Sequence, residues 1–183
     1  MIEVYEHYKY RLSPMRRGNL EKLARFLEHR IEPPKFDMSS FMTFEGRWVD
    51  NMVEALEAFY DEFEEKGDQT AVYNHCGTSA CAVGHGPLAG IPIKKREDWV
   101  DYANRVFINQ SAGSGGETWS FLFSGDWKDH DNTPIGAAAR IWYLFENGTP
   151  VNRYGEVDHR NIGFYQDYKL GGSKHPDAVK EAV

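Results

Sequence analysis

Two cysteines and two histidines share one short segment, residues 75–85, which reads HCGTSACAVGH. Cys76 and Cys81 are the only cysteines of the chain. A disulfide between them would close a very small and strained loop. In a reducing compartment both are expected as thiols or thiolates. The segment therefore leaves three kinds of chemistry open: packing in the core, metal binding and nucleophilic catalysis.

Packing in the core is the interpretation that we favour for the segment. Small residues flank Cys81 on both sides, and a helix built from them can approach another backbone closely. We expect this helix to begin at Thr78 or Ser79, either of which can cap it, and to end at about His85. Cys81 would then be buried as a small apolar residue, whereas Cys76 would lie outside the helix and be the more exposed thiol.

Metal binding is the second interpretation of the segment. Cys81 and His85 are four residues apart and would share a face of a helix, with Cys76 just ahead of them. Zinc favours such a set of ligands in tetrahedral geometry. The spacing differs from that of zinc fingers, so a ligand from elsewhere, such as His130 or His159, would be needed.

A cysteine nucleophile is the third interpretation. A thiol in the first turn of a helix is partly ionised by the helix dipole, and this favours attack by Cys76 or Cys81. The phrase CGTSAC resembles in part the cysteine phrase of papain-like enzymes, although an alanine follows its second cysteine instead of an aromatic residue. His159 would be the base, with Asp158 or Asn161 to orient it.

An acidic cluster precedes the strongest helix signal of the chain. Asp126, Asp129 and Asp131 lie in the phrase GDWKDHDN, directly before Thr133 and Pro134. Carboxylates near the start of a helix are favoured by its dipole, and Asx turns account for the clustering. The spacing does not match a calcium-binding EF-hand loop.

Hydrophobic periodicity and cap residues predict the elements that must position these groups. The expected helices run from Pro14 to a stop at Pro33, from an Asp50 cap to Gly67, from Thr78 or Ser79 to about His85, from Glu97 to about Phe107, and over residues 134–147. Ile141 and Trp142 fall in the apolar stripe of the last helix, so we expect both in the core.

The two ends of the chain are expected to form a small sheet. Residues 2–12 alternate between apolar and polar side chains, which is typical of a half-buried strand. Residues 151–170 contain segments that can pair with it, and residues 171–183 are expected to fray. The predicted fold is therefore a helix-dominated α+β protein with one domain over residues 1–183.

Composition limits the classes of function. The chain has 183 residues, of which 41% are hydrophobic, and this excludes a disordered protein. Its 21 Lys and Arg against 28 Asp and Glu give a net charge of −7, which argues against nonspecific nucleic-acid binding. No apolar run reaches the length of a membrane span and the first residues are too polar for a signal peptide, so we expect a soluble, cytoplasmic protein.

A scattered set of residues resembles small uncharacterised proteins of phages and bacteria. The shared signature C-G-T-x-x-C-x-x-G is carried here by Cys76, Gly77, Thr78, Cys81 and Gly84. A phrase similar to theirs lies upstream at residues 36–38. Downstream matches are Leu122, Phe123, Trp127, Ala138, Arg140, Ile141 and Leu144. The family often has an aromatic residue in place of His85, and residues 44–74 look like an insertion. The resemblance implies kinship and a phage-like origin, with the host cytoplasm as the compartment, but no activity.

Two classes of function follow from the sequence. The first is a non-enzymatic binding protein, phage-associated, that acts on a protein or a small ligand and needs no cofactor. Its support is the missing catalytic constellation, the many aromatic residues and an acidic surface able to meet a basic partner. The alternative is a cysteine-dependent hydrolase that uses Cys76 or Cys81 with His159. We lean toward the non-enzymatic interpretation.

Overall fold

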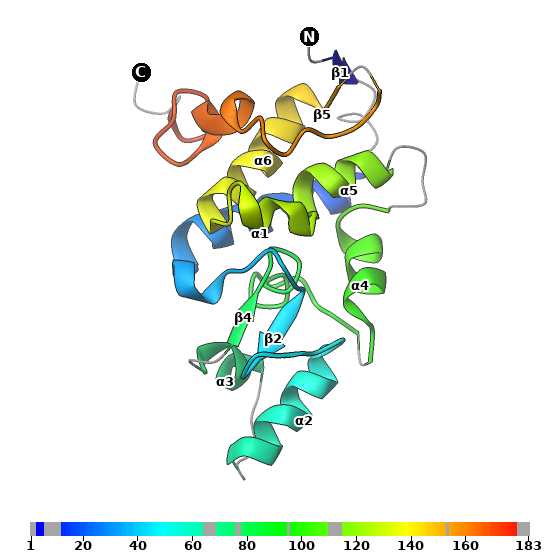
Figure 1. The fold of residues 1–183 in the computed structure, drawn as a ribbon, viewed down its shortest axis with the longest axis vertical. Helices are drawn as coiled ribbons and strands as arrows, with labels where there is room; N and C mark the ends of the chain where they lie inside the picture. Colours follow the sequence, from blue (N-terminus) through cyan, green and yellow to red (C-terminus); the bar gives the residue numbers. More distant parts are fainter. Residues whose placement is uncertain are drawn as a thin grey trace.

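The computed structural model of the chain describes residues 3–5, 12–63, 69–75, 78–94, 96–109, 115–152 and 154–178. Its elements form a helix-dominated α+β fold, with a helical part above a small three-stranded sheet in Figure 1. The helices are α1 (Pro14–Arg30), α2 (Met52–Phe63), α3 (Gln69–Asn74), α4 (Trp99–Val106), α5 (Gly115–Phe123) and α6 (Pro134–Asn147), with the short 3-10 helices η2 (Pro33–Lys35), η3 (Gly125–Asp129) and η4 (Gly163–Tyr168). None of the described helices combines the length and hydrophobicity that crossing a membrane requires.

Helices α1 and α6 pack against each other and form the centre of the helical part. Each begins as the sequence predicts, with a hydroxyl cap followed by proline. Ser13 Oγ accepts the Arg16 N–H at 3.4 Å, and Thr133 Oγ1 accepts the Gly136 N–H at 2.9 Å. These caps satisfy amides that have no partner inside the helix. Leu20, Leu23, Ala24 and Leu27 of α1 are buried against this centre.

The core position of Ile141 and Trp142 is confirmed. They are 1% and 4% exposed, respectively. The Trp142 indole N–H donates to Glu28 Oε1 at 2.7 Å, and the same oxygen lies 2.9 Å from His175 Nε2. This buried contact fixes the end of the described chain to α1. The expectation that residues 171–183 fray is therefore wrong for residues 171–178, and residues 179–183 lie outside the described part.

The start of α6 carries a second buried polar cluster, built around Asp131. Its carboxylate accepts the Thr133 hydroxyl at 2.6 Å and the Tyr165 hydroxyl at 3.0 Å, and lies 2.9 Å from the Lys169 ammonium. Burial tends to raise the pKa of Asp131, but the hydrogen bond from Thr133 and the nearby ammonium of Lys169 outweigh it and hold the pKa below its usual value. A Cβ on Gly136 would lie only 2.3 Å from the carboxylate. Asp131 therefore needs glycine at this position of the helix.

The two chain ends pair as predicted. Strand β1 (Glu3–Tyr5) runs antiparallel to β5 (Thr149–Val151), with Glu3 opposite Val151. The pairing covers only this short part of the predicted strand over residues 2–12, because residues 2 and 6–11 lie outside the described part. The partner strand begins just before the predicted segment 151–170. Further along that segment, residues 163–168 form η4 instead of a strand.

The second sheet was not predicted and contains residues 78–80, which lie directly before Cys81. Strands β2 (Met42–Phe44) and β3 (Arg47–Trp48) form a hairpin, and β4 (Thr78–Ala80) pairs antiparallel with β2. The hairpin turn has φ 48° at Glu45 and φ 74° at Gly46, which is the left-handed pair typical of two-residue hairpins. The predicted helix over residues 78–85 is therefore wrong. Residues 78–80 are a strand and residues 82–90 form consecutive turns.

The helix prediction is wrong here because the small residues let a turn, and not a helix, pass close to another stretch of backbone. A Cβ on Gly84 would lie 2.0 Å from the Phe41 carbonyl oxygen. The turns after β4 therefore pass directly against the chain that leads into β2. The small side chains do allow a close backbone contact, but turns make it against residue 41 and no helix is involved.

The caps of the remaining helices differ from the prediction at one point. Asn51, not Asp50, caps α2, because Asn51 Oδ1 accepts the N–H groups of Val53 and Glu54 at 3.0 and 3.1 Å. The predicted end of this helix at Gly67 lies outside the described residues, and α2 ends at Phe63. Helix α4 lies within the predicted range 97–107.

We predict that Trp142→Ala lowers the free energy of unfolding by about 3–5 kcal/mol, as expected for removing a buried aromatic side chain. Trp48→Ala is the matched control, because Trp48 is 75% exposed and its removal should change stability by no more than about 0.5 kcal/mol. Urea unfolding measures both changes. Equal stability of the two variants would contradict the assignment of Trp142 to the core.

We also predict opposite effects for two glycine-to-alanine changes in helices. Gly18→Ala in α1 should stabilise the protein by about 0.5–1 kcal/mol, since its Cβ would meet nothing within 4 Å. Gly136→Ala should destabilise it by about 1.5–3 kcal/mol, since the new Cβ displaces the hydrogen-bonded carboxylate of Asp131. Thermal unfolding measures both, and a stabilised Gly136→Ala protein would show that Asp131 is not held at this site.

Candidate functional site

Cys81 lies in the core, as the packing interpretation expects. It is 3% exposed, and its backbone N–H donates to the Phe41 carbonyl at 3.2 Å. Burial raises the pKa of its thiol to about 11, although the backbone amides of Gly84 and Val83 oppose that change. At neutral pH the group is therefore a thiol and not the thiolate that nucleophilic attack or metal binding requires. Cys76 lies outside the described residues.

His85 is a packing residue of the same segment. It is 2% exposed and stacks on Phe36 with ring centroids 6.2 Å apart and an interplanar angle of 7°. Its Nε2 lies 2.9 Å from the Lys35 carbonyl, to which the N–H donates. Burial lowers the pKa of the imidazole to about 4, so it is neutral at pH 7.

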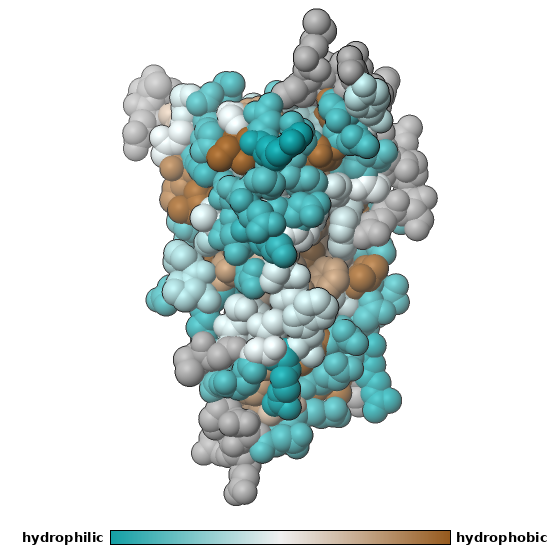
Figure 2. All heavy atoms as spheres, in the orientation of Figure 1, coloured by the Kyte–Doolittle hydropathy of each residue, from teal (hydrophilic) through white to brown (hydrophobic). Residues whose placement is uncertain are grey.

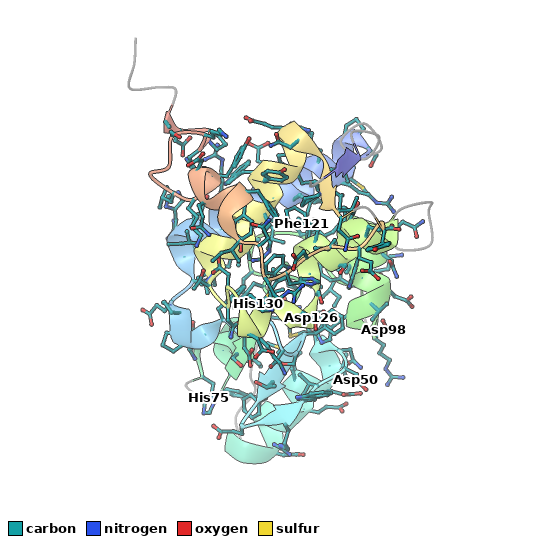
Figure 3. All side chains as sticks on the ribbon, turned by 45° about the horizontal axis from the view of Figure 1, so that its top comes forward. Asp50, His75, Asp98, Phe121, Asp126 and His130 are labelled. Carbon is teal, nitrogen blue, oxygen red and sulfur yellow. The ribbon has the colours of Figure 1, made fainter. Side chains whose placement is uncertain are left out.

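The predicted metal set of Cys76, Cys81 and His85 depended on a helix that does not form. Cys81 and His85 were expected to share a helical face, but Cys81 directly follows β4 and His85 lies in the turns after it. Within the described ranges, no three His, Cys, Asp or Glu side chains form a group able to hold a metal ion. His130, considered as a further ligand, follows η3, whereas His75 lies beside the three-stranded sheet (Figure 3).

His159, the predicted base, contacts helix α5 and does not contact Cys81. Its Nε2 lies 3.1 Å from the Ser120 carbonyl, and its ring meets the Trp127 ring edge-on at 4.8 Å. Asp158, expected to orient it, pairs with Arg160 at 3.1 Å. The Cys81 carbonyl accepts the His85 backbone N–H at 3.1 Å, but in the described part of the chain no hydrogen bond joins the Cys81 thiol to a histidine ring. A cysteine-dependent hydrolase would therefore have to rely on Cys76.

Ser120, His159 and Asp126 come together in the order of a serine-hydrolase triad, which the sequence did not suggest. Ser120 Oγ lies 3.5 Å from His159 Nε2, and His159 Nδ1 lies 3.9 Å from Asp126 Oδ2. The Nε2–H that donates to the Ser120 carbonyl cannot at the same time take the hydroxyl proton. The distance to Asp126 is also too long for a hydrogen bond. The arrangement anchors the segment around His159 to α5 and does not activate Ser120.

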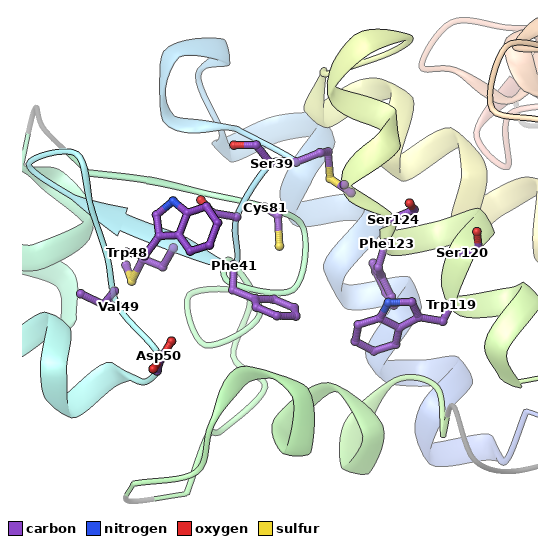
Figure 4. A pocket seen from close by; sticks show the side chains of 14 residues that line it. Ser39, Phe41, Trp48, Val49, Asp50, Cys81, Trp119, Ser120, Phe123 and Ser124 are labelled. Carbon is purple, nitrogen blue, oxygen red and sulfur yellow. The ribbon is translucent and has the colours of Figure 1, made fainter.

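A cavity of about 390 Å³ lies between the chain around β2 and β3 on one side and α5 with η3 on the other. Figure 4 shows Trp48 and Trp119 on opposite sides of it, with Phe41 between them. Figure 2 shows apolar atoms at mid-height of a largely hydrophilic face, at a level between α5 and the three-stranded sheet in Figure 1. The lining comprises Met38, Ser39, Ser40, Phe41, Met42, Trp48, Val49, Asp50, Cys81, Trp119, Ser120, Phe123, Ser124 and Gly125.

Buried backbone contacts fix the sheet side of this cavity. The indole N–H of Trp99, on α4, donates to the Val49 carbonyl at 2.9 Å. The Trp99 backbone N–H donates to the Asp50 carbonyl at 3.3 Å. Val49 also donates its N–H to the Met42 carbonyl at 3.3 Å. Residues 49 and 50 are thus held in place between the hairpin and α4.

Aromatic contacts fix the opposite side. Trp119 packs edge-on against Phe123 of the same helix at 5.4 Å and against Phe41 at 6.4 Å. The three rings connect α5 to the chain that leads into β2. Trp48 belongs to the hairpin and exposes most of its ring at the mouth of the cavity. The cavity therefore has a packed inner wall and an open aromatic edge.

Sequence reasoning missed this cavity. Residues 35–49 contain several aromatic residues without a strand or helix period. That pattern was the one local sign that these side chains line a cavity. Five of the fourteen lining residues, between Trp119 and Gly125, come from α5 and the chain that leads into η3, about 70 residues further along the chain. No local pattern connects two segments so far apart.

We predict that Cys81 in a Cys76→Ser protein reacts slowly with a maleimide at pH 7. Because the pKa of the thiol is raised to about 11, the rate should rise about tenfold per pH unit up to pH 10. An ordinary thiol levels off near pH 8.5. The same variant in denaturant, labelled at the ordinary rate, is the control. Rapid labelling of the folded protein at pH 7 would contradict the core assignment and restore the nucleophile interpretation.

Comparison with protein families, with curated proteins and with solved structures finds no match to the chain, so its function has to be argued from its own site.

Proposed function

We propose that the protein is a non-enzymatic binding protein whose ligand is a small molecule held in the aromatic cavity. The observation that carries the proposal is the cavity of about 390 Å³ between the β2–β3 hairpin and α5. Its volume lies in the range of about 300–1,000 Å³ that is typical of small-molecule sites. A protein partner would need a broad surface instead, with a contact area of roughly 800 Å² on each side.

The lining supports an apolar body with one or two polar groups. Four aromatic rings face the cavity, from Phe41, Trp48, Trp119 and Phe123. Serine hydroxyls at positions 39, 40, 120 and 124 add hydrogen-bonding capacity at separate points. Small-molecule sites characteristically combine a mostly apolar lining with a few placed polar groups.

The side chains of the lining also support binding without catalysis. The Cys81 thiol is protonated at neutral pH because burial raises its pKa to about 11. The hydroxyl of Ser120 faces a histidine nitrogen that is already engaged with the Ser120 carbonyl. Neither the Cys81 thiol nor the Ser120 hydroxyl therefore has a histidine free to act as its base. The resemblance to small phage and bacterial proteins is the basis for including phage association in the proposal.

A neutral apolar dye tests the proposal. Prodan, which changes its emission when it leaves water, should bind saturably with one site per chain. Ser120→Leu places a larger side chain in the cavity and should weaken this binding by about tenfold or more. Ser120→Ala is the matched control, since it removes the same hydroxyl without filling the cavity, and it should bind nearly as the parent does.

A second readout locates the dye. Prodan should slow the labelling of Cys81 in the Cys76→Ser protein, because Cys81 forms part of the cavity wall. Circular dichroism must show that Ser120→Leu keeps its fold. A folded Ser120→Leu protein that binds Prodan as tightly as the parent, without protection of Cys81, would refute the cavity as the binding site.

A further inference from the structure

We infer that the ligand of this cavity is an organic cation, with an ammonium-type head and an apolar body. The inference rests on the proposed function, because it names the chemical class that the same cavity would take. It is carried by the combination of a carboxylate with no ionic partner, Asp50, and tryptophan rings that no cation of the described chain covers.

Asp50 is the only charged residue among the described residues that line the cavity. Its carboxylate forms no ion pair with any described Lys, Arg or His. It does not cap α2 either, since Asn51 does so. The backbone at Asp50 is nevertheless fixed, because its carbonyl accepts the Trp99 N–H and its N–H donates to Glu54 at 2.9 Å. The structure thus holds an unneutralised carboxylate at the cavity.

The aromatic rings provide the second part of a cation site. A cation over the face of an aromatic ring is attracted by the ring quadrupole, most strongly by tryptophan. Trp48 and Trp119 lie on opposite sides of the cavity in Figure 4, and Asp50 lies on the same side as Trp48. In the described part of the chain, Lys and Arg side chains cover other rings, such as Phe145 and Trp127, but neither of these two.

The charge balance of the lining separates this class of ligand from the others. An anion would meet a carboxylate with no lysine, arginine or histidine of the lining to offset it. A neutral ligand would leave the exposed carboxylate to water and would gain nothing from its charge. A cation pairs with the carboxylate and gains the ring contacts. The net charge of −7 also raises the local concentration of cations around the protein.

A pair of probes with the same shape tests the inference by calorimetry at pH 6.5. The cation is (3-hydroxyphenyl)trimethylammonium, and 3-tert-butylphenol replaces its charged nitrogen by carbon. The cation should bind about tenfold more tightly or better, as expected for a charge against a tryptophan face in a partly desolvated site.

Substitutions at Asp50 and Trp48 test whether these residues cause the preference for the cation. Asp50→Asn should weaken binding of the cation about fivefold or more and leave 3-tert-butylphenol unchanged. Asp61→Asn, an equal charge change on the exposed part of α2, is the matched control and should alter neither affinity. Trp48→Leu keeps an apolar group but removes the ring, so it should reduce the preference for the cation.

The outcomes separate this inference from the proposed function. Equal or tighter binding of 3-tert-butylphenol, or an unchanged cation affinity in Asp50→Asn, overturns the cation while the binding cavity stands. Binding of neither probe, together with no binding of Prodan, overturns the proposed function and this inference with it. A cation preference that disappears in Asp50→Asn and persists in Asp61→Asn supports both.

Discussion

The carboxylate of Asp131, set against the first turn of α6, is the constraint from which much of the structure follows. It gives the buried Arg140 an opposite charge and receives Tyr165 and Lys169 from the chain after β5. A buried charge without such partners is strongly destabilising. The pKa of Asp131 is lowered in the folded protein. The contribution of the ionised carboxylate to the free energy of unfolding is therefore complete at neutral pH, and it is lost as the pH falls through that lowered pKa.

Residues at the start of α6 and within it position both walls of the cavity. On one side, Asn132 Oδ1 accepts the N–H of Met38, which lines the cavity, at 2.8 Å. On the other, Arg140 stacks 4.2 Å from the Trp127 ring centre, and the Trp127 indole donates to the Phe121 carbonyl of α5 at 2.8 Å. The cavity wall on α5 is thus held through two successive contacts from α6. A substitution at the start of α6 is therefore expected to alter the shape of the cavity although the substituted residue does not line it.

Local signals in the sequence were sufficient where an element is determined by its own residues. The caps at Ser13 and Thr133 with their following prolines set the starts of α1 and α6, and the apolar stripe placed Trp142 in the core. They failed at residues 78–85, because the strand there depends on pairing with β2, more than 30 residues earlier. They failed at Asp50 for a smaller reason, since Asn51 competes for the same cap one residue later. The cavity combines both difficulties, as its two walls come from distant segments.

Residues 78–85, which include Cys81, have a role in this cavity that does not need a reactive thiol. Gly84 lets the turns after β4 pass against the Phe41 carbonyl, and the N–H of Cys81 donates to that same oxygen. Phe41 is thereby held where its ring meets Trp119. A side chain larger than cysteine would extend into the space that the wall leaves open, and a charged one would be buried without a partner. The small, protonated thiol suits this wall, and the positions of Cys81 and Gly84 follow from their shared contact with the Phe41 carbonyl.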